Sequence, residues 1–331
     1  MVVFFIQRIA QALIVMLVIS VIGFAIADNL GDPLRELVGQ SVSEAERDQL
    51  RDKLGLNDPF WVQYGRFLGR AVQGDLGTSY FFKKPALEVI LNKFPATFEL
   101  VLVSSLLIIF FCVPAGLYAG IFPSHFLSKI LMLFSIVGIS VPVFLTAIFL
   151  IYIFSVELGW MPSFGRGETV LLSFWEGRIK WTTGFLTLDG WRHLILPSIA
   201  LSSIMLPLFM RLIRAEMMET LRTDYVRFAW AKGLSRRRVW LVHAFRNSLL
   251  PIVTVGGVQI GTLIAYTILT ETVFQWPGMG FLFLEAVNRV DTPLIIAYII
   301  IVGLIFVVIN TLVDLTYHFI NPVIRVSGRK N

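Results

Sequence analysis

Six long apolar stretches are the feature that most constrains how this chain of 331 residues can fold. A helix needs roughly 20 mostly apolar residues to cross the hydrocarbon core of a bilayer, and each stretch is about that long. The stretches are Ile9–Ala27, Phe98–Gly120, Ile130–Val156, Leu194–Ile213, Leu249–Thr270 and Pro293–Ile320. Charged residues make up only 15% of the chain, against about 25% in a soluble domain. We therefore predict an all-α, polytopic membrane protein with six transmembrane helices, because a bilayer offers no water to satisfy backbone groups.

The distribution of Lys and Arg predicts the orientation of these helices. Residues 211–248, between the fourth and fifth stretches, contain nine basic and three acidic residues. With this segment, Arg8, Lys129 and the C-terminal tail in the cytoplasm, that side carries a net charge of +11 and the opposite side −3. This positive-inside pattern predicts that both termini are cytoplasmic. Because this pattern explains the excess of Lys and Arg in residues 211–248, we interpret the basic loop as a sign of membrane topology and not as a nucleic-acid site.

The first apolar stretch has two readings. Arg8, the apolar run and Ala25 to Ala27 resemble the parts of a cleaved signal peptide. The run is about 18 residues long, however, and a signal peptide usually has 7–15. Its removal would also leave an odd number of spans, so we expect a retained transmembrane helix.

The chain is expected to have four segments. An N-terminal transmembrane helix covers 1–30 and a long, helical external loop covers 31–95. A core of five transmembrane helices covers 96–320 and includes a cytoplasmic loop at 214–250. A basic cytoplasmic tail covers 321–331.

Two helices are predicted in the external loop. Ser43 and Glu46 have the spacing of a capping box, and Gly55 can end the helix that they begin. Pro59 opens a second helix, Phe60–Val72, with aromatic residues at helical spacing. The loop is either a small cap packed on the spans or a docking or gating surface for something outside the membrane.

The second external segment, Gly159–Arg192, contains four tryptophans. Trp160 and Trp191 at its ends fit an interfacial aromatic belt.

No motif for catalysis or metal binding is found. The phosphate-binding pattern GxxxxGK[ST] is absent, as are H-E-x-x-H and G-x-S-x-G. Cys112 is the only cysteine, and the four histidines are scattered singly. We therefore expect no enzyme activity, no ATP hydrolysis and no metal site in this chain.

The cytoplasmic loop has the pattern of a helix, a glycine and a second helix. Thr223 or Asp224 can cap a short helix that runs to about Lys232, and Gly233 suits the left-handed position after it. Ser235 can start a second helix that ends before Pro251. The first helix offers a mixed face of apolar and small side chains, formed by Tyr225, Phe228, Ala229 and Lys232. Such a face favours a partner protein, and the alternative is an amphipathic helix on the membrane surface.

The same loop resembles that of a known family. YVRFAWAKGLS at Tyr225–Ser235 and HAFRNSLLP at His243–Pro251 look like the EAA loop of ABC-transporter permeases, in the version of the dipeptide, oligopeptide and nickel permeases. Further matching segments are Gly31–Pro33, Gly74–Ser79, Phe94–Leu100, Ser140–Phe144, Leu158–Pro162, His193–Pro197 and Glu271–Gly280, with Asn310, Asp314 and Tyr317 at the end of the last span. The loop departs from the family pattern at Arg227–Ala229, where EAA is usual, and at Trp230.

The resemblance implies one of two membrane subunits of a bacterial ATP-driven importer in the inner membrane. A second permease, two ATPase subunits that bind ATP and Mg, and an external solute-binding protein would complete it. The short helix would then be the coupling helix that contacts an ATPase. The residues implied in this coupling are Asp224, Tyr225, Arg227, Phe228, Ala229, Ala231, Lys232, Gly233 and Leu234.

Other residues of the spans have candidate roles. Thr254, Gln259, Thr262 and Tyr266 are candidate pathway residues, together with Thr267 and Thr270, although hydrogen bonding between helices is the favoured reading for each. Four glycines have the small-xxx-small spacing of close helix packing: Gly116, Gly120, Gly257 and Gly261. Pro114, Pro142 and Pro207 are candidate kinks, and Glu99 and Asp314 are as readily snorkelling or capping residues as functional ones.

The favoured function is a permease subunit for short peptides. The same architecture could import nickel chelates, glutathione, haem or antimicrobial peptides. An ion-coupled secondary transporter would show an internal repeat and ionisable residues at mid-membrane, and the sequence has neither. A membrane enzyme lacks a catalytic set.

Overall fold

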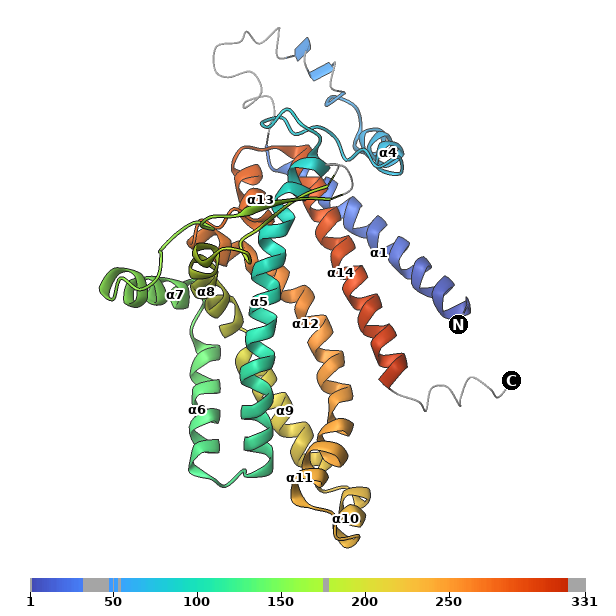
Figure 1. Cartoon of the computed structure of the whole chain (residues 1–331). Helices are drawn as coiled ribbons and strands as arrows, with labels where there is room; N and C mark the ends of the chain where they lie inside the picture. Colours follow the sequence, from blue (N-terminus) through green and yellow to red (C-terminus); the bar gives the residue numbers. More distant parts are fainter. Residues whose placement is uncertain (1, 32–47, 50, 53–54, 175–178, 321–331) are drawn as a thin grey trace. The chain divides into compact units, whose positions relative to one another are not determined.

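The computed structural model describes residues 2–31, 48–49, 51–52, 55–174 and 179–320 (Figure 1). The chain divides into two compact units. The first unit comprises residues 1–97, 170–183 and 277–307. The second comprises residues 98–169, 184–276 and 308–331. The predicted capping box at Ser43 and Glu46, Trp175 and the basic tail lie outside the described residues.

Helices dominate both units. Four of the described helices are long and apolar enough to cross a membrane: Ile6–Ala27 in α1 (Val2–Asn29), the whole of α5 (Ala86–Ile121), residues 236–273 and Thr292–Thr316 in α14 (Thr292–Ile320). A fifth results if α8 (Leu188–Ser203) and α9 (Leu206–Thr220), which meet at a bend of 55°, count as one broken span.

The third predicted stretch, Ile130–Val156, does not form a single helix. It is divided into α6 (Phe126–Ser140) and a second helix made of α7 (Val143–Leu150) and the π-helical η1 (Ile151–Glu157). Val141 between them is extended, with φ −97° and ψ 118°. The residue before a proline is pushed out of the helical region, so Pro142 ends α6 instead of bending it.

The other prolines behave differently. Pro207 lies in the first turn of α9, directly after the bend, where its missing N–H costs no helical hydrogen bond. Pro114 lies inside α5, which continues through it.

The helix that begins after Ser235 was expected to end before Pro251, and this expectation is wrong. It runs through α11 (Arg236–Arg238) and π-helical η2 (Val239–Phe245) into α12 (Arg246–Val273), with Pro251 inside. Membrane helices tolerate such interruptions because side chains can satisfy freed carbonyls.

In the first unit, α1 packs against two other helices. The Phe24 ring lies 5.4–5.8 Å from the rings of Phe60, Tyr64 and Phe67 in α4 (Phe60–Ala71), which confirms the second predicted loop helix. The Ser20 and Tyr64 hydroxyls are 2.8 Å apart and hydrogen-bonded. Gly23 of α1 lies against Ile299 of α14.

A buried carboxylate ties the chain before α5 to the turn between α13 (Met279–Asn288) and α14. Asp291 accepts hydrogen bonds from the Ser79 hydroxyl at 2.5 Å and from the backbone N–H groups of Tyr80 and Phe81 at 3.1 and 3.2 Å. Ser79 belongs to the segment Gly74–Ser79 that the sequence analysis singled out. The segment is therefore held in place by a contact with residues more than 200 positions away.

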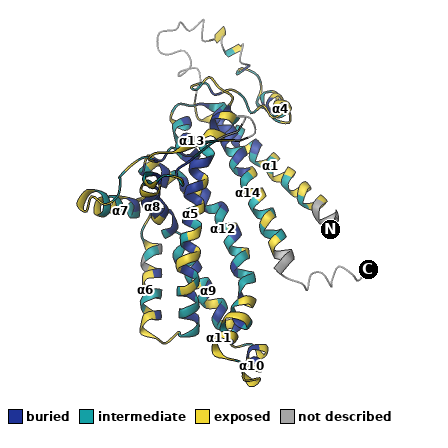
Figure 2. Ribbon diagram, in the orientation of Figure 1, coloured by how far each residue is buried: buried dark blue, intermediate teal, exposed yellow. Residues whose placement is uncertain are grey.

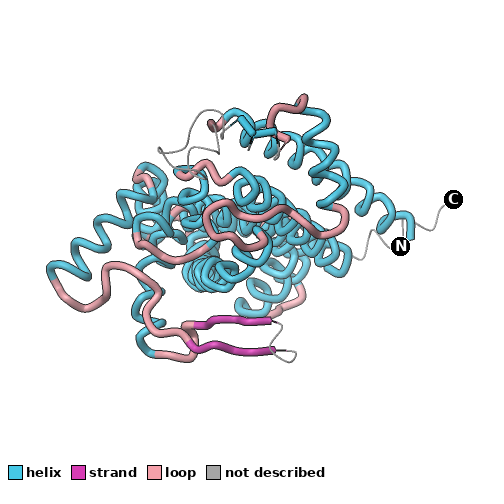
Figure 3. Tube along the Cα trace, turned by 90° about the horizontal axis from the view of Figure 1, so that it is seen from above, coloured by secondary structure: helices cyan, strands magenta, loops and turns pink. Residues whose placement is uncertain are grey.

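The all-α prediction has one exception. Strands β1 (Val170–Phe174) and β2 (Ile179–Thr183) form an antiparallel pair in the second segment that was predicted to be external, with Leu172 opposite Trp181 (Figure 3). The β-branched and aromatic residues at 179–183 carry a strand signal. The sequence did not lead to a strand prediction here, because the run is short and lies in a segment rich in proline and glycine.

The second unit is built around α5, α6, α8, α9 and α12, with α9 packed against both α6 and α12. Figure 2 shows residues coloured as exposed along α6. Phe126, Leu133, Phe134 and Ile136 are large apolar residues on that exposed surface. Since a surface of this kind suits hydrocarbon and not water, α6 has the character of a lipid-facing helix.

Candidate functional site

The predicted short helix in the basic loop is present as α10 (Asp224–Ala231). Thr223 is its N-cap in an extended conformation, and its hydroxyl donates to the Thr220 carbonyl at 2.6 Å. Asp224 lies in the first turn, where a negative charge complements the helix dipole. Arg227 lies 3.4 Å from the Asp224 carboxylate in an exposed pair, which contributes little. Local sequence signals therefore place both ends of this helix.

One face of α10 is buried in the second unit. Val226 and Ala229 pack with Met217 of α9 and with Val239 and Ala244 of η2. Leu234 lies at the edge of this cluster. Ala229 therefore departs from the expected exposed face, because its small side chain faces the helices that support α10. Val226 was missed by the sequence analysis, although its spacing of three from Ala229 is the signal for an inward face.

The opposite face of α10 exposes large aromatic side chains. Phe228 is 61% exposed and Tyr225 is 43% exposed. The Lys232 ammonium lies 4.6 Å from the centre of the Phe228 ring, a cation–π distance. Trp230, absent from the predicted site, is also exposed, as are Asp224, Arg227 and Ala231. The buried side fixes the helix and leaves an aromatic and charged surface free to contact another molecule.

Gly233 has the predicted left-handed conformation, with φ +74°. Its N–H donates to the Trp230 carbonyl at 2.9 Å. A Cβ atom at this position would meet no atom within 4 Å. Glycine is therefore needed here for its backbone conformation and not for lack of space. The left-handed conformation of Gly233 sets the direction in which the chain leaves α10.

Four threonines of α12 donate to carbonyls of their own helix, whereas hydrogen bonding between helices was the favoured expectation. Thr254 and Thr262 donate to carbonyls of α12 itself, Leu250 and Val258, at 2.9 and 3.4 Å. The buried Thr267 and Thr270 do the same, to Ile264 and Tyr266. A threonine hydroxyl can donate its hydrogen bond to a carbonyl three or four residues earlier in its own helix. A threonine in a span therefore implies no partner helix.

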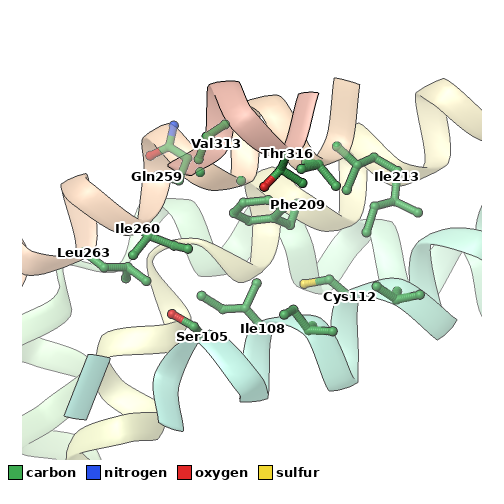
Figure 4. A pocket seen from close by; sticks show the side chains of 16 residues that line it. Ser105, Ile108, Cys112, Phe209, Ile213, Gln259, Ile260, Leu263, Val313 and Thr316 are labelled. Atoms are coloured by element: carbon green, nitrogen blue, oxygen red, sulfur yellow. The ribbon is translucent and has the colours of Figure 1, made fainter. Parts of the chain in front are cut away.

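Among the four candidate pathway residues, the structure brings only Gln259 to the wall of a cavity in the second unit. The cavity has a volume of about 280 Å³, and its wall is almost entirely apolar. Figure 4 shows Ser105 and Cys112 projecting from α5 on one side and Val313 and Thr316 from α14 on the other. The Ser105 hydroxyl has no hydrogen-bond partner among the described residues. Thr254, Thr262 and Tyr266 are not in this wall.

Three of the four predicted packing glycines lie where helices approach closely. A Cβ atom at Gly116 would lie 2.7 Å from Ile213 Cβ, and one at Gly120 would lie 2.8 Å from Met217 Cβ. At Gly257 it would overlap the Val313 side chain of α14. Gly261 is buried in α12. The contacts of Gly116, Gly120 and Gly257 are all internal to the second unit.

Glu99 does not snorkel, contrary to one of its two expected roles. Only 1% of its side chain is exposed, and the Arg166 guanidinium lies 2.7 Å from its Oε2 atom. The Gly184 N–H donates to its other oxygen at 3.0 Å. A carboxylate inside α5 therefore holds Arg166 and Gly184, which lie on either side of the segment that contains the strands. Sequence reasoning could not pair Glu99 with Arg166, since 67 positions separate them.

No group of three or more His, Cys, Asp or Glu residues capable of holding a metal ion occurs within the described ranges.

Comparisons with known proteins identify two matching family models. "Binding-protein-dependent transport system inner membrane component" matches residues 112–326. "Binding-prot-dependent transport system membrane comp, N-term" matches residues 1–101. Together they cover nearly the whole chain.

Individual relatives match over almost their full length. The dipeptide transport system permease protein DppB of Alkalihalophilus pseudofirmus is 37% identical over 332 residues, which cover 96% of this chain and 98% of that one. The di/tripeptide transport system permease protein DppB of Pseudomonas aeruginosa is 39% identical over 308 residues, 89% and 90% of the two chains. The glutathione transport system permease protein GsiC of Shigella flexneri is 35% identical over 321 residues, 97% and 98%.

The fold is also similar to a solved structure. A chain of the MetNI methionine ABC transporter, in an inward-facing conformation, superposes with a TM-score of 0.52 at 14% identity. The match covers 71% of this chain and 97% of the other.

Proposed function

The chain belongs to the family of binding-protein-dependent transport system inner membrane components, and we propose that it is a permease subunit of an ATP-driven importer of short peptides. The observation that carries the proposal is the full-length similarity to permeases named for dipeptide and di/tripeptide transport. Glutathione is a second candidate substrate, because a permease named for it is similar over nearly the same length.

In the proposed arrangement the chain crosses the membrane six times. The crossings are α1, α5, the pair α6 and α7, the bent pair α8 and α9, α12 and α14. An even number places both termini on one side, and the excess of Lys and Arg in residues 211–248 makes that side the cytoplasm. The chain before α5 and the segment with β1 and β2 then face outward.

The proposed coupling contact is the exposed face of α10. Tyr225, Phe228 and Trp230 would insert into a cleft of an ATPase subunit, and Arg227 and Lys232 would pair with its acidic groups. The buried face, Val226 and Ala229, would transmit a push on α10 to α9 and η2, which pack on it. Support comes from the division of α10 into one face fixed by packing and one left exposed.

The proposal assigns the chemistry to partners. Two ATPase subunits bind ATP and Mg and close on each other, a second permease completes the pathway, and an external binding protein delivers the peptide. The part of this chain is to form half of the pathway and to convert motion at α10 into a change of the helices. The sequence agrees with this division, since it contains no phosphate-binding loop.

Reconstitution of the complete transporter in vesicles tests the proposal. We expect ATP-dependent accumulation of a labelled dipeptide that requires the binding protein, and no ATP hydrolysis by this subunit alone. A parallel assay with labelled glutathione distinguishes the two candidate substrates. Accumulation without ATP, driven by an ion gradient, would contradict the proposal.

A further inference from the structure

The first unit contains a cavity that the proposed function does not yet use. It has a volume of about 520 Å³ and is lined by residues of α1, α4, the chain before α5 and the start of α14. Cavities of 300–1,000 Å³ are typical for small-molecule ligands.

The wall of this cavity combines two kinds of side chain. Phe24, Phe67 and Ile296 provide an apolar surface. The polar lining includes Gln63, Thr78, Thr292, Arg66 and Arg70. The described lining therefore has two guanidinium groups and no carboxylate, so the cavity is suited to a ligand with one anionic and one apolar part.

The two arginines differ in their partners. Arg66 forms an ion pair with Asp58 and donates to the Gly55 carbonyl at 3.1 Å. The Arg70 guanidinium makes no hydrogen bond or ion pair with any described residue. The buried Asp291, whose carboxylate acts on the same Tyr80 phenol as Arg70, is already engaged by Ser79 and two backbone N–H groups. Arg70 is thus the cation left available to a ligand.

Tyr80 provides a neutral hydrogen-bond donor in the same wall. Burial raises the pKa of its phenol, the Asp291 carboxylate raises this pKa further, and the Arg70 guanidinium opposes the two. The phenol keeps its proton at neutral pH, so it can donate to an anionic oxygen.

We propose that this cavity binds the terminal carboxylate of a short peptide, with Arg70 as its cationic partner and the surface of Phe24 and Phe67 receiving an apolar side chain. The inference rests on the proposed function, because dipeptides, tripeptides and glutathione all carry a free carboxylate. It adds a receiving site on the external part of the permease itself, separate from that of the delivering protein. An acidic side chain of the delivering protein is the other possible source of a carboxylate, and the experiment separates the two.

The test measures binding of alanyl-phenylalanine and of its C-terminal amide to the complete transporter in nanodiscs, without the binding protein. We expect the free acid to bind about tenfold more tightly than the amide, as for a charge-assisted hydrogen bond. Arg70→Gln should remove this difference, and Arg70→Lys should retain part of it. The matched control is Lys84→Gln, an exposed external cation whose 3.8 Å pair with Glu88 is weak and which is not part of the cavity wall.

Equal binding of acid and amide, or an unchanged preference in Arg70→Gln, would overturn the inference. If Arg70→Gln lowers the uptake that the binding protein supports in vesicles while direct binding of the free acid is unchanged, the carboxylate comes from that protein and the peptide site is excluded. ATP-driven uptake by the native transporter is measured in parallel, after reconstitution in vesicles together with the binding protein. Absence of all uptake would refute the proposed function, whereas normal uptake with no acid preference would refute only the site.

Discussion

Arg166 and Glu99 form a buried ion pair in which the guanidinium Nη2 lies 2.7 Å and Nε 3.1 Å from the same carboxylate oxygen. The side chains are 8% and 1% exposed. Arg166 also lies 6.0 Å from the centre of the Trp276 ring. The pair therefore anchors the chain after η1 to α5 in the second unit.

Breaking this pair should destabilise the second unit strongly. Glu99→Gln leaves the Arg166 charge buried without its counter-ion, and the expected loss is about 3–5 kcal/mol of unfolding free energy. The measurement is the thermal unfolding of the purified transporter in detergent. The control is Glu88→Gln, which removes the exposed pair with Lys84 and should change stability by less than about 1 kcal/mol. Equal effects of the two variants would show that Glu99 is not structurally important.

Gly257→Ala should be destabilising, and a second substitution should rescue it. An added methyl group would overlap the Val313 side chain, and overpacking of this kind costs about 1–3 kcal/mol. In Gly257→Ala with Val313→Ala, both Cγ atoms of Val313 are removed but its Cβ atom stays 2.8 Å from the added methyl group, so the double variant should recover part of the stability. A double-mutant cycle of unfolding midpoints measures the coupling. Additive losses would mean that the two helices are not in contact at this point.

Gly233→Val should uncouple transport while leaving the protein in the membrane. The residue has φ +74°, which a β-branched side chain resists at a cost of about 1–3 kcal/mol. No neighbouring atom would clash, so the damage should be limited to the direction of the chain after α10. Peptide uptake and recovery of the ATPase subunits in a pull-down are the two readouts.

Two controls define the Gly233 result. Gly233→Asn should be mild, because asparagine accepts left-handed conformations more readily. Arg236→Ala, at an exposed position, should also be mild. Normal uptake and ATPase recovery in Gly233→Val would remove the case for this loop as the coupling element.

Phe228→Ser should weaken ATPase binding without affecting folding. The side chain is largely exposed, and exposed substitutions usually change stability by no more than about 0.5 kcal/mol. We expect lower recovery of the ATPase subunits and an unchanged unfolding temperature of the permease alone. Leu241→Ser, at an exposed apolar position in η2, is the control. A similar loss of ATPase from both variants would favour a general membrane-surface role for the loop.

Labelling with a membrane-impermeant maleimide should establish the orientation. In a Cys112→Ala background, which has no other cysteine, Trp61→Cys on α4 should react from outside in intact cells. Arg236→Cys should react only after the membrane is permeabilised. Both positions are exposed, so accessibility within the protein does not confound the comparison. Reaction of Arg236→Cys in intact cells would reverse the proposed topology.

Features that depend on neighbouring residues could be predicted from the sequence. The bounds of α10, the left-handed Gly233 and the start of α4 after Pro59 all follow from dihedral preferences and from contacts within one helical turn. The apolar stretches likewise predicted where helices occur, because a bilayer imposes the same requirement on every span. The family resemblance rested on these same local motifs.

Only the tertiary structure determined which face of each helix is buried and which distant residues are in contact. Whether Ala229 or Phe228 is buried depends on the position of Met217 and Val239, which α10 itself does not specify. The partners of Glu99 and Asp291 lie 67 to more than 200 positions away, and no periodicity in the sequence relates them. The break between α6 and α7 and the pairing of β1 with β2 also required the structure. The physical reason is that helix formation responds to local dihedral angles, whereas burial, ion pairing and strand pairing exist only after distant parts of the chain have come together.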